Sequence, residues 1–517
     1  MKSGISIKPG SHGTNRLPAR PRLDGAARLQ TRITAFLLPA VQLATVLLFA
    51  AWGLLHLHGY TYSTAPWLGP HGWSDYDEGV YLVSARLMNQ GFPLFSSVFS
   101  SQPPLFITGL AVFLRVFHDA AGAGYLYSLS FGLLALGGVL WLSWECSGRW
   151  SATMAAVVLA LSPGFVIAAH AIEAEAPMMG LAAVSAAAAA RYARTSSRLW
   201  LCTAALLLAA ATLMKLLGVL GLAPLAAAIV LQAAGTPARA RLNRCLWDAL
   251  FAAFTLLVPI AASFALFSPR QQFDQVVMFH TKASAIPGLA QSTADTFGVF
   301  KSWDPGLIAL GATGIAIAAV LRLRTYAIPI SWFVVTLVST LLYYPLFLHH
   351  LTVLLPPLAA CAGACLAPFD VSVVRPMARR TALLLCALSA AVYSAWLPST
   401  FGRATGSFSA DSNRAKSLQV AWLQSHAAEG EFVLTDNQVL AVAAHRLVPP
   451  ELSDTSNVRW RSGYLSLQLL EQSTAKADVT AVLLTRTLQF DPPFVRWLGS
   501  HYHVAHSLGV PGILFTR

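Results

Sequence analysis

Residues 33–57 read ITAFLLPAVQLATVLLFAAWGLLHL, an apolar run without a single charged residue. A helix needs about 20 such residues to cross the hydrocarbon core of a bilayer, and this run is too long for the core of a cleaved signal peptide. The whole chain supports the same interpretation. Of its 517 residues, 56% are hydrophobic and only 11% are charged, whereas soluble domains have roughly 25% charged residues. The sequence therefore predicts a membrane protein and excludes a water-soluble globular fold.

Further apolar runs of spanning length follow the first one. They lie near residues 122–145, 151–171, 173–192, 199–216, 218–234, 247–267, 303–321, 326–346, 349–369 and 380–397. Long runs with few charges are typical of membrane-spanning helices. We therefore predict an all-α polytopic membrane protein with about eleven transmembrane helices. Residues 32–398 form its predicted membrane domain, and the basic residues 1–31 form an N-terminal tail.

Two stretches of the membrane domain do not fit a simple span. Pro104 to Phe117 is apolar but short, which is typical of an interfacial or re-entrant helix. We expect it along the outer face, within an outer loop that covers residues 58–121. Residues 199–234 would be about 50 Å long as one helix, which exceeds a bilayer core of about 30 Å. Lys215 is therefore predicted to mark an outer turn between two spans.

The basic residues determine the predicted orientation. Lys and Arg outnumber Asp and Glu by 35 to 22, and most of them lie in short gaps between apolar runs. Positive residues of short loops stay in the cytoplasm. With the N-terminus inside, the clusters 191–198, 239–244 and 375–380 all fall on the cytoplasmic side. We expect a multi-pass protein of the plasma membrane. Because topology explains the net charge, a nucleic-acid partner is not expected.

After about residue 399 the composition becomes that of a soluble domain. The pattern predicts helices over 412–426 and 438–446 and strands over 431–435, 481–485 and 512–516. Residues 399–517 are thus predicted to form a small α/β domain, which an odd number of spans places outside the cytoplasm. Asp436, at the end of the first strand, is expected to be structural. The cysteines lie within or beside apolar runs, so neither a disulfide framework nor a zinc module is expected.

The outer loop contains a group of carboxylates. Residues 73–82 read WSDYDEGVYL, which places Asp75, Asp77 and Glu78 at the start of a predicted helix over 76–88. Acidic residues in a first helical turn stabilise the helix through its dipole. Crowded carboxylates also hinder each other's ionisation and can then serve as a general base. Both interpretations are open on these residues alone.

Other ionisable residues are predicted at the outer ends of spans. They are His170, Glu173 and Glu175 between the third and fourth spans, Lys215 between the fifth and sixth, and His349 and His350 at the start of the tenth. Each alone has a structural explanation, such as a first helical turn ahead of a proline or a snorkelling side chain. Ionisable groups at membrane depth are costly, however, and mark functional sites by default. Because all of them share the face of Asp77, we favour one functional site.

These residue types indicate a chemistry. Carboxylates take up a proton or hold a divalent cation, and Lys and His offset the charge of a phosphate. At the outer leaflet, such a site suits a lipid phosphate. We therefore predict group transfer from a membrane-bound phosphate carrier to an acceptor hydroxyl. A carboxylate activates the hydroxyl, and cations stabilise the departing phosphate.

The same residues resemble family 39 of the GT-C class of membrane glycosyltransferases, which includes the protein O-mannosyltransferases and the lipid A aminoarabinose transferase. The resemblance covers about residues 32–370 and depends on four matches in order. These are the Asp77-Glu78 pair after the first span, Gln102-Pro-Pro-Leu105, the turn from His170 to Glu175, and His349-His350 followed by Leu354-Leu-Pro-Pro357. The extra β-trefoil repeats of eukaryotic protein O-mannosyltransferases have no counterpart in the sequence.

The resemblance implies a donor and an acceptor. The donor is a polyprenyl-phosphate sugar, and the acceptor is a lipid, glycan or protein of the cell envelope. Asp77 is the implied base, with Glu78 beside it, and Lys215 is an implied contact of the donor phosphate. Gln102 departs from the aminoarabinose transferase pattern, which has Lys at this place to contact the phosphate.

The phosphate charge that Gln102 does not meet can be met in two ways. Lys215, His349 and His350 can supply it, or a divalent cation can. The carboxylates predicted for such a cation are Asp77, Glu173 and Glu175. No other cofactor is expected. The remaining residues predicted to line the substrate site are Asp75, Gln102 and His170.

A transporter or flippase of a lipid-linked sugar is the alternative function. Transporters place their polar residues near the bilayer midplane, in broken helices or inverted repeats. Here the polar residues fall at the predicted span ends, and the sequence shows no internal repeat. The glycosyltransferase is therefore the leading hypothesis.

The charge pattern predicts an orientation that reporter fusions can test. Alkaline phosphatase fused after Arg517 should be active, because this reporter folds only outside the cytoplasm, and the same reporter fused after Arg244 should be inactive. Green fluorescent protein at the two positions should give the opposite pattern. Equal alkaline phosphatase activity at both positions would contradict the predicted topology.

Overall fold

A computed structural model of the protein describes most of the chain. The described residues are 36–54 except 52, 76–118, 122–370, 377–395 with gaps at 379, 382, 389–390 and 392, 410–505 and 512–517. The predicted span 380–397 therefore lies partly outside the described residues, and Asp75 lies outside them.

Helices of the membrane domain form a bundle. They are α4 (Ala123–Cys146), α5 (Arg149–Ala160), α6 (Pro163–His170), α7 (Glu175–Thr195), α8 (Arg198–Met214), η1 (Leu216–Gly221), α9 (Leu222–Ala233), α10 (Ala238–Leu266), α13 (Thr293–Trp303), α14 (Pro305–Val320), η3 (Arg324–Tyr326), α15 (Ala327–Leu342), η4 (Leu348–Leu354), α16 (Leu355–Ala362), η5 (Gly363–Leu366) and α17 (Ala367–Asp370).

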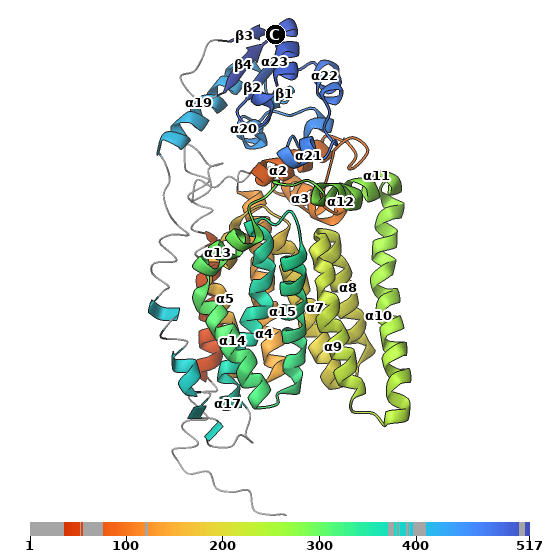
Figure 1. Ribbon diagram of the computed structural model, residues 1–517, viewed down its shortest axis with the longest axis vertical. Helices are drawn as coiled ribbons and strands as arrows, with labels where there is room; N and C mark the ends of the chain where they lie inside the picture. The colour runs from red at the N-terminus through yellow and green to blue at the C-terminus, as the bar shows by residue number, and fades with distance from the viewer. Residues whose placement is uncertain are drawn as a thin grey trace, which may run out of the picture.

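Shorter helices lie across one end of the bundle. They are α2 (Tyr76–Asn89), α3 (Pro104–Val116), α11 (Pro269–Phe273), the π-helical turn η2 (Asp274–Met278) and α12 (Phe279–Ser284). Figure 1 shows them between the bundle and a smaller domain that contains the sheet. The predicted short helix 104–117 is therefore confirmed as α3.

The fold is that of a polytopic membrane protein, as predicted. Five described helices are long and apolar enough to cross a bilayer, and seven are if each of two bent pairs counts as one span. The segments Phe36–Ala51 and Arg198–Met214 form shorter apolar helices. The predicted turn at Lys215 is present, between the end of α8 and the start of η1. The number eleven stays a prediction.

The predicted span 151–171 is not one straight helix. It breaks into α5 and α6, which are bent by 68°, and α13 and α14 meet at 91°. Proline begins the second helix of each pair, at Pro163 and at Pro305, where it lacks the N–H of a continuing helix. The two breaks are joined, because the Gly164 amide donates to the buried carboxylate of Asp304 over 3.1 Å.

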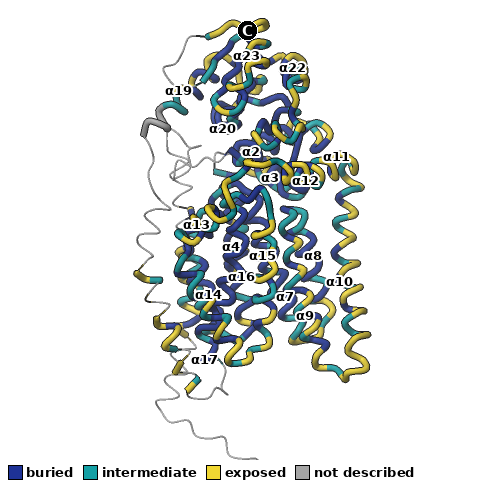
Figure 2. The backbone as a smooth tube through the Cα atoms, viewed as in Figure 1, coloured by how far each residue is buried: buried dark blue, intermediate teal, exposed yellow. Residues whose placement is uncertain are grey.

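The centre of the bundle is packed through small residues. A Cβ atom on Gly138 of α4 would lie 2.7 Å from the backbone nitrogen of Val184 in α7, and one on Gly180 of α7 would lie 2.7 Å from the carbonyl oxygen of Phe131. The Ala-rich run of α7 thus allows two backbones to approach closely. Figure 2 shows buried residues throughout α4, α7 and α16, whereas α10 at the edge of the bundle is largely exposed.

The C-terminal part is a small α/β unit. Its elements are α19 (Ala410–His426), β1 (Val433–Thr435), α20 (Gln438–Ala443), η6 (Pro450–Leu452), α21 (Asn457–Arg461), α22 (Leu467–Lys476), β2 (Ala481–Leu484), η7 (Leu488–Phe490), α23 (Pro492–His501), β3 (His503–Val504) and β4 (Ile513–Thr516). The sheet has the order β1-β2-β4-β3, with β1 and β2 parallel and the other neighbours antiparallel. Each helix and strand that the pattern predicted here is present.

Helix α2 joins this unit to the bundle. A Cβ atom on Gly79 would collide with the backbone nitrogen of Val439 in α20, so only glycine allows the two helices to pack this closely. Arg86 also donates to the carbonyl oxygen of Val442, over 2.9 Å. Helix α2 is therefore held against the C-terminal unit in both its first and its last turn.

Candidate active site

The start of α2 presents one carboxylate to a cavity, which lies where α2, α12 and α21 cap one end of the bundle. Asp77 is half-buried in the first turn of the helix and lines the cavity. A first turn stabilises the ionised form of a carboxylate through the helix dipole. Tyr76 beside it is buried. This burial, and next the charge of Asp454, hold the pKa of its phenol well above the usual value. Its hydroxyl is therefore a proton donor at neutral pH.

Glu78 points elsewhere. Its carboxylate accepts hydrogen bonds from the backbone N–H of Ile172, over 3.0 Å, and from the hydroxyl of Tyr125, over 3.3 Å. It is buried and does not line the cavity. Since Ile172 lies in the turn between α6 and α7, Glu78 positions that turn relative to α2. Of the predicted pair, Asp77 therefore lines the cavity, whereas Glu78 is packed behind it against Tyr125 and Ile172.

The turn between α6 and α7 contains the next group. Glu175, which begins α7, is buried and forms an ion pair with the buried ammonium of Lys215. His349 lies beside both acidic residues of the turn, with Nδ1 3.9 Å from Glu173 Oε1 and Nε2 3.8 Å from Glu175 Oε1. The structure therefore brings Glu173, Glu175, Lys215 and His349 together, as the sequence predicted.

His350 completes this group with a defined tautomer. Its Nδ1 accepts a hydrogen bond from the backbone N–H of Phe347, over 3.3 Å, so in the neutral ring Nε2 carries the hydrogen. The rings of His349 and His350 meet edge to face, with centroids 4.4 Å apart. His170, in contrast, packs against Phe49, and its Nδ1–H donates to the carbonyl oxygen of Val166 over 2.6 Å; it does not line the cavity.

Gln102 lies at the cavity beside residues of two other elements. Its side-chain amide donates to the hydroxyl of Tyr81 over 3.3 Å. The carbonyl of Ser101 bonds to Nε2 of His280, which comes from α12, over 3.0 Å. Burial lowers the pKa of His280, so its ring is neutral at pH 7 and Nε2–H is the donor in this bond. Gln102 is thus held at the cavity by Tyr81, and Ser101 before it is held by His280.

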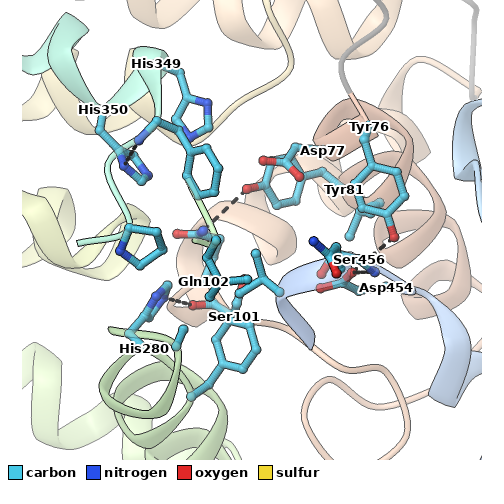
Figure 3. Close-up of a pocket in the computed structure, with 18 of the residues that line it drawn as sticks. Tyr76, Asp77, Tyr81, Ser101, Gln102, His280, His349, His350, Asp454 and Ser456 are labelled. Atoms are coloured by element: carbon cyan, nitrogen blue, oxygen red, sulfur yellow. Dashed lines mark hydrogen bonds between the residues drawn. The ribbon is translucent and has the colours of Figure 1, made fainter. Parts of the chain in front are cut away.

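The cavity has a volume of about 470 Å³ and two chemically distinct sides. Lys215, His280, His349 and His350 line one side, which we call the basic wall. Asp454, Ser456, Asn457, Val458 and Arg486 line the other, which we call the C-terminal wall. Figure 3 shows the three histidines opposite Tyr76, Asp454 and Ser456, with Asp77, Tyr81 and Gln102 between them. Glu173 and Glu175 do not line the cavity and lie behind the basic wall.

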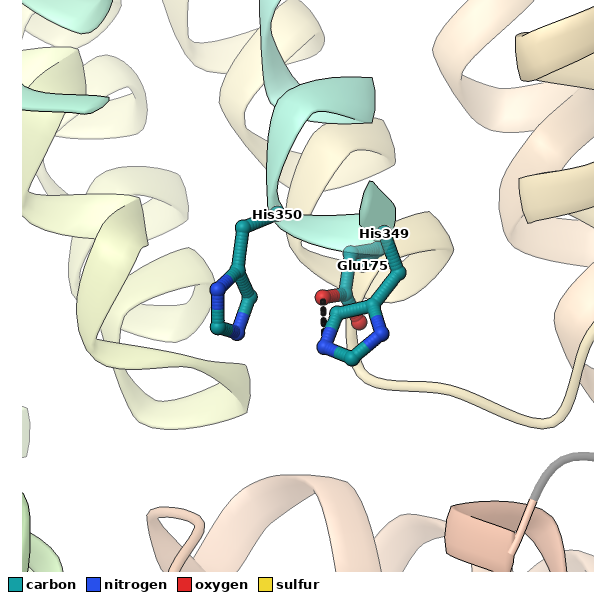
Figure 4. A group of neighbouring side chains, drawn as sticks. All are labelled: Glu175, His349 and His350. Carbon is teal, nitrogen blue, oxygen red and sulfur yellow. Dashed lines mark ion pairs between the residues drawn. The ribbon is translucent and has the colours of Figure 1, made fainter. Parts of the chain in front are cut away.

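Three residues at the basic wall have the spacing of a metal site. Ligand atoms of Glu175, His349 and His350 lie within 4.8 Å of one another (Figure 4). These are ligand types that Zn²⁺ accepts. However, the Lys215 ammonium contacts Oε1 of Glu175, the same oxygen that faces His349. A cation would meet this positive charge, so the residues do not fit a metal ion while Lys215 is protonated.

Sequence reasoning missed several residues of the site. His280 lies in a segment that the span pattern left as a connection, and its polar character was the available signal. Arg486 follows β2 as Asp436 follows β1, and ends of neighbouring parallel strands lie at one edge of a sheet. Asp436 itself is structural, as predicted, because it accepts the backbone N–H groups of Thr485, Arg486 and Leu488. It thereby fixes the turn that carries Arg486.

Comparison with solved structures identifies the class of the fold. The chain has the GT-C fold of integral-membrane glycosyltransferases. It is similar to ArnT from Cupriavidus metallidurans bound to undecaprenyl phosphate, with a TM-score of 0.63 and 15% identity, over 91% of this chain and 97% of that one.

A second similar structure is the archaeal oligosaccharyltransferase AglB from Archaeoglobus fulgidus in complex with an inhibitory peptide and a dolichol-phosphate. Its TM-score is 0.54 at 12% identity, over 88% of this chain and 70% of that one. The same oligosaccharyltransferase in complex with Zn and sulfate matches with a TM-score of 0.52 at 12% identity, over 86% and 68%. No family model and no curated protein matches the sequence. At these identities the similarity concerns the fold.

The buried ion pair predicts a strong coupling in stability. Lys215→Met should lower the free energy of unfolding by about 3–5 kcal/mol, because it leaves the carboxylate of Glu175 buried without its ammonium. Glu175→Gln should have a similar effect. The double variant should recover most of this loss, as judged by thermal unfolding of the detergent-purified protein. Losses that simply add would show that the two charges are not coupled.

Proposed function

We propose that the protein is a glycosyltransferase that moves a sugar from a polyprenyl-phosphate donor to a hydroxyl of a cell-envelope acceptor. One observation supports this most directly. Within a GT-C fold, the carboxylate of Asp77 shares a cavity with the nitrogen groups of the basic wall. A base and a phosphate-binding surface are the two parts that such a transfer requires.

The basic wall is suited to the donor phosphate. The surface that it presents consists of the Lys215 ammonium and three imidazoles, whereas the carboxylates of Glu173 and Glu175 lie behind it. Glu175 pairs with Lys215, and both carboxylates lie within 3.9 Å of His349, so they hold these two side chains in place. Nε2–H of neutral His350 is a further donor. The departing phosphate would therefore meet the Lys215 ammonium and the Nε2–H of His350 as its charge develops, whereas the Nε2–H of His280 is donated to Ser101.

Asp77 is the proposed base. It takes the proton of the acceptor hydroxyl while the oxygen attacks the anomeric carbon of the sugar. The new C–O bond forms as the bond from that carbon to the phosphate oxygen breaks, and the polyprenyl phosphate leaves with the electron pair. Because the nucleophile and the phosphate are on opposite faces of the sugar, the transfer inverts the anomeric centre.

The solved structures of similar fold support a prenyl-phosphate donor. ArnT from Cupriavidus metallidurans is bound to undecaprenyl phosphate, and AglB from Archaeoglobus fulgidus is in complex with a dolichol-phosphate. The cavity lies where α2, α12 and α21 cap one end of the bundle (Figure 1).

Transport across the bilayer would require polar groups nearer the midplane. With the orientation predicted from charge, the transfer takes place outside the cytoplasm of the cell.

We propose that the reaction needs no metal ion. Glu175, the one carboxylate of the group with His349 and His350, already pairs with the ammonium of Lys215, which supplies a fixed positive charge there. Among the described residues, Asp77 does not belong to a group of side chains with the spacing of a metal site. The predicted cation set of Asp77, Glu173 and Glu175 is therefore replaced in this proposal by Lys215 and the imidazoles.

Asp77→Asn should reduce transfer by a factor of about 10²–10⁴, because the amide cannot accept the proton. Transfer would be measured as movement of a radiolabelled sugar from undecaprenyl phosphate into envelope material of membranes that contain the variant. Asp295→Asn is the matched control, since it removes an exposed carboxylate from the first turn of α13 and retains a capping side chain. Near-normal transfer by Asp77→Asn, at an equal protein level, would reject the proposed base.

Transfer by the wild-type protein should be unchanged by EDTA. Zn²⁺ should not raise its melting temperature, but it should raise that of Lys215→Met, in which the Glu175 carboxylate is released to the two imidazoles. Loss of transfer in EDTA that Zn²⁺ or Mn²⁺ restores would instead establish a metal requirement.

A further inference from the structure

We propose that the C-terminal wall is the acceptor subsite, and that it takes an uncharged, hydroxyl-rich group such as a sugar residue of an envelope glycan. This inference rests on the proposed function and assigns the C-terminal unit a direct role in it.

The C-terminal wall is rigidly connected to the start of α2. The hydroxyl of Tyr76 donates to Oδ1 of Asp454 over 3.1 Å and accepts the backbone N–H of Thr455 over 2.7 Å. Asp454 Oδ1 also accepts the N–H of Ser456, over 2.7 Å. Since Tyr76 directly precedes Asp77, the distance between the proposed base and this wall is fixed by one buried side chain.

A buried arginine, Arg459, holds the backbone of the loop that forms the C-terminal wall. The guanidinium of Arg459 donates to the carbonyl oxygens of Glu451, over 2.7 Å, and Asp454, over 2.6 Å, and Gln438 donates to that of Leu452, over 2.9 Å. Burial lowers the pKa of Arg459 to about 10, which still leaves it charged at neutral pH. The loop is therefore ordered before a ligand arrives, and an ordered site binds without a further entropic penalty.

The chemistry of the wall differs from that of the basic wall. Within the described residues, Oδ2 of Asp454 accepts no hydrogen bond, so it can take ligand hydroxyls at the cavity. The amide of Asn457 adds a donor and an acceptor. Arg486 lies over the ring of Tyr76, 4.5 Å from its centroid, and its charge balances that of Asp454. A wall with balanced charge and several hydrogen-bonding groups favours a neutral polyol over a second phosphate.

The order of groups across the cavity separates acceptor from donor. Asp77 lies between the basic wall and the C-terminal wall (Figure 3). In an inverting displacement the acceptor oxygen and the departing phosphate occupy opposite faces of the sugar. If the phosphate is at the basic wall, then the acceptor is at the C-terminal wall, with its hydroxyl toward Asp77.

Binding of two probes to the full-length protein in nanodiscs tests this assignment. The probes are undecaprenyl phosphate and a panel of methyl glycosides of glucose, galactose, mannose and arabinose, the latter followed by saturation-transfer NMR. Asn457→Ala and Arg486→Ala should each weaken glycoside binding at least about fivefold and leave the Kd of undecaprenyl phosphate within twofold. Lys215→Met should show the reverse. Arg496→Ala, an exposed arginine of α23 away from the cavity, is the matched control and should change neither.

A labelled cysteine gives a second test that does not depend on a deleted contact. Asn457 is exposed at the cavity, so Asn457→Cys can be modified with a bulky maleimide. The modified protein should lose glycoside binding and retain undecaprenyl phosphate binding. Normal undecaprenyl phosphate binding with no glycoside bound, or glycoside binding that survives these changes, would overturn this inference alone. Wild-type protein that does not bind undecaprenyl phosphate would overturn the proposed function as well.

Discussion

Lys215 and Glu175 face each other where almost no water reaches, and the arrangement of the site depends on this pair. The side chains are 7% and 1% exposed, so neither charge could be separated from the other without a large desolvation penalty. The pair connects the end of α8 to the start of α7, and Nε2 of His349, from η4, lies 3.8 Å from the same carboxylate. Three segments thus meet at one carboxylate, and the buried ion pair joins two of them.

A second constraint is steric, and it holds α2 against the C-terminal unit on the other side of the cavity. Gly79 allows α2 to contact the backbone of α20, and Tyr76 and Arg86 anchor the two ends of that contact to the C-terminal unit. Glu78, in the same turn, reaches the other way and binds the backbone of Ile172. One turn of α2 therefore connects the bundle, the turn that carries Glu175 and the C-terminal unit. Asp77 lies at the centre of this connection.

The sequence predicted the parts of the site that follow from topology. Lys215, His349 and His350 could be placed on the face of Asp77 because span ends and charge asymmetry determine sides, and the structure brings them to one cavity. The sequence could not predict that the side chain of Glu78 would point away from the cavity. This depends on Tyr125 in α4 and on Ile172 in the turn between α6 and α7. Asp454 and Arg486 were missed because a local pattern carries no information on how one folded unit docks on another.

The docking of the C-terminal unit explains why the cavity has two unlike walls. In the proposed reaction a lipid-linked donor would reach the site from the bilayer, and its phosphate would be met by groups at the ends of spans, where Lys215, His349 and His350 lie. The proposed acceptor would come from the aqueous side, and the unit that covers one end of the bundle could bind it without contacting lipid. Because Tyr76 bridges the two parts beside Asp77, the proposed base acts where the two substrates can meet. A unit attached only by a flexible linker could not keep the base and the acceptor at a fixed distance.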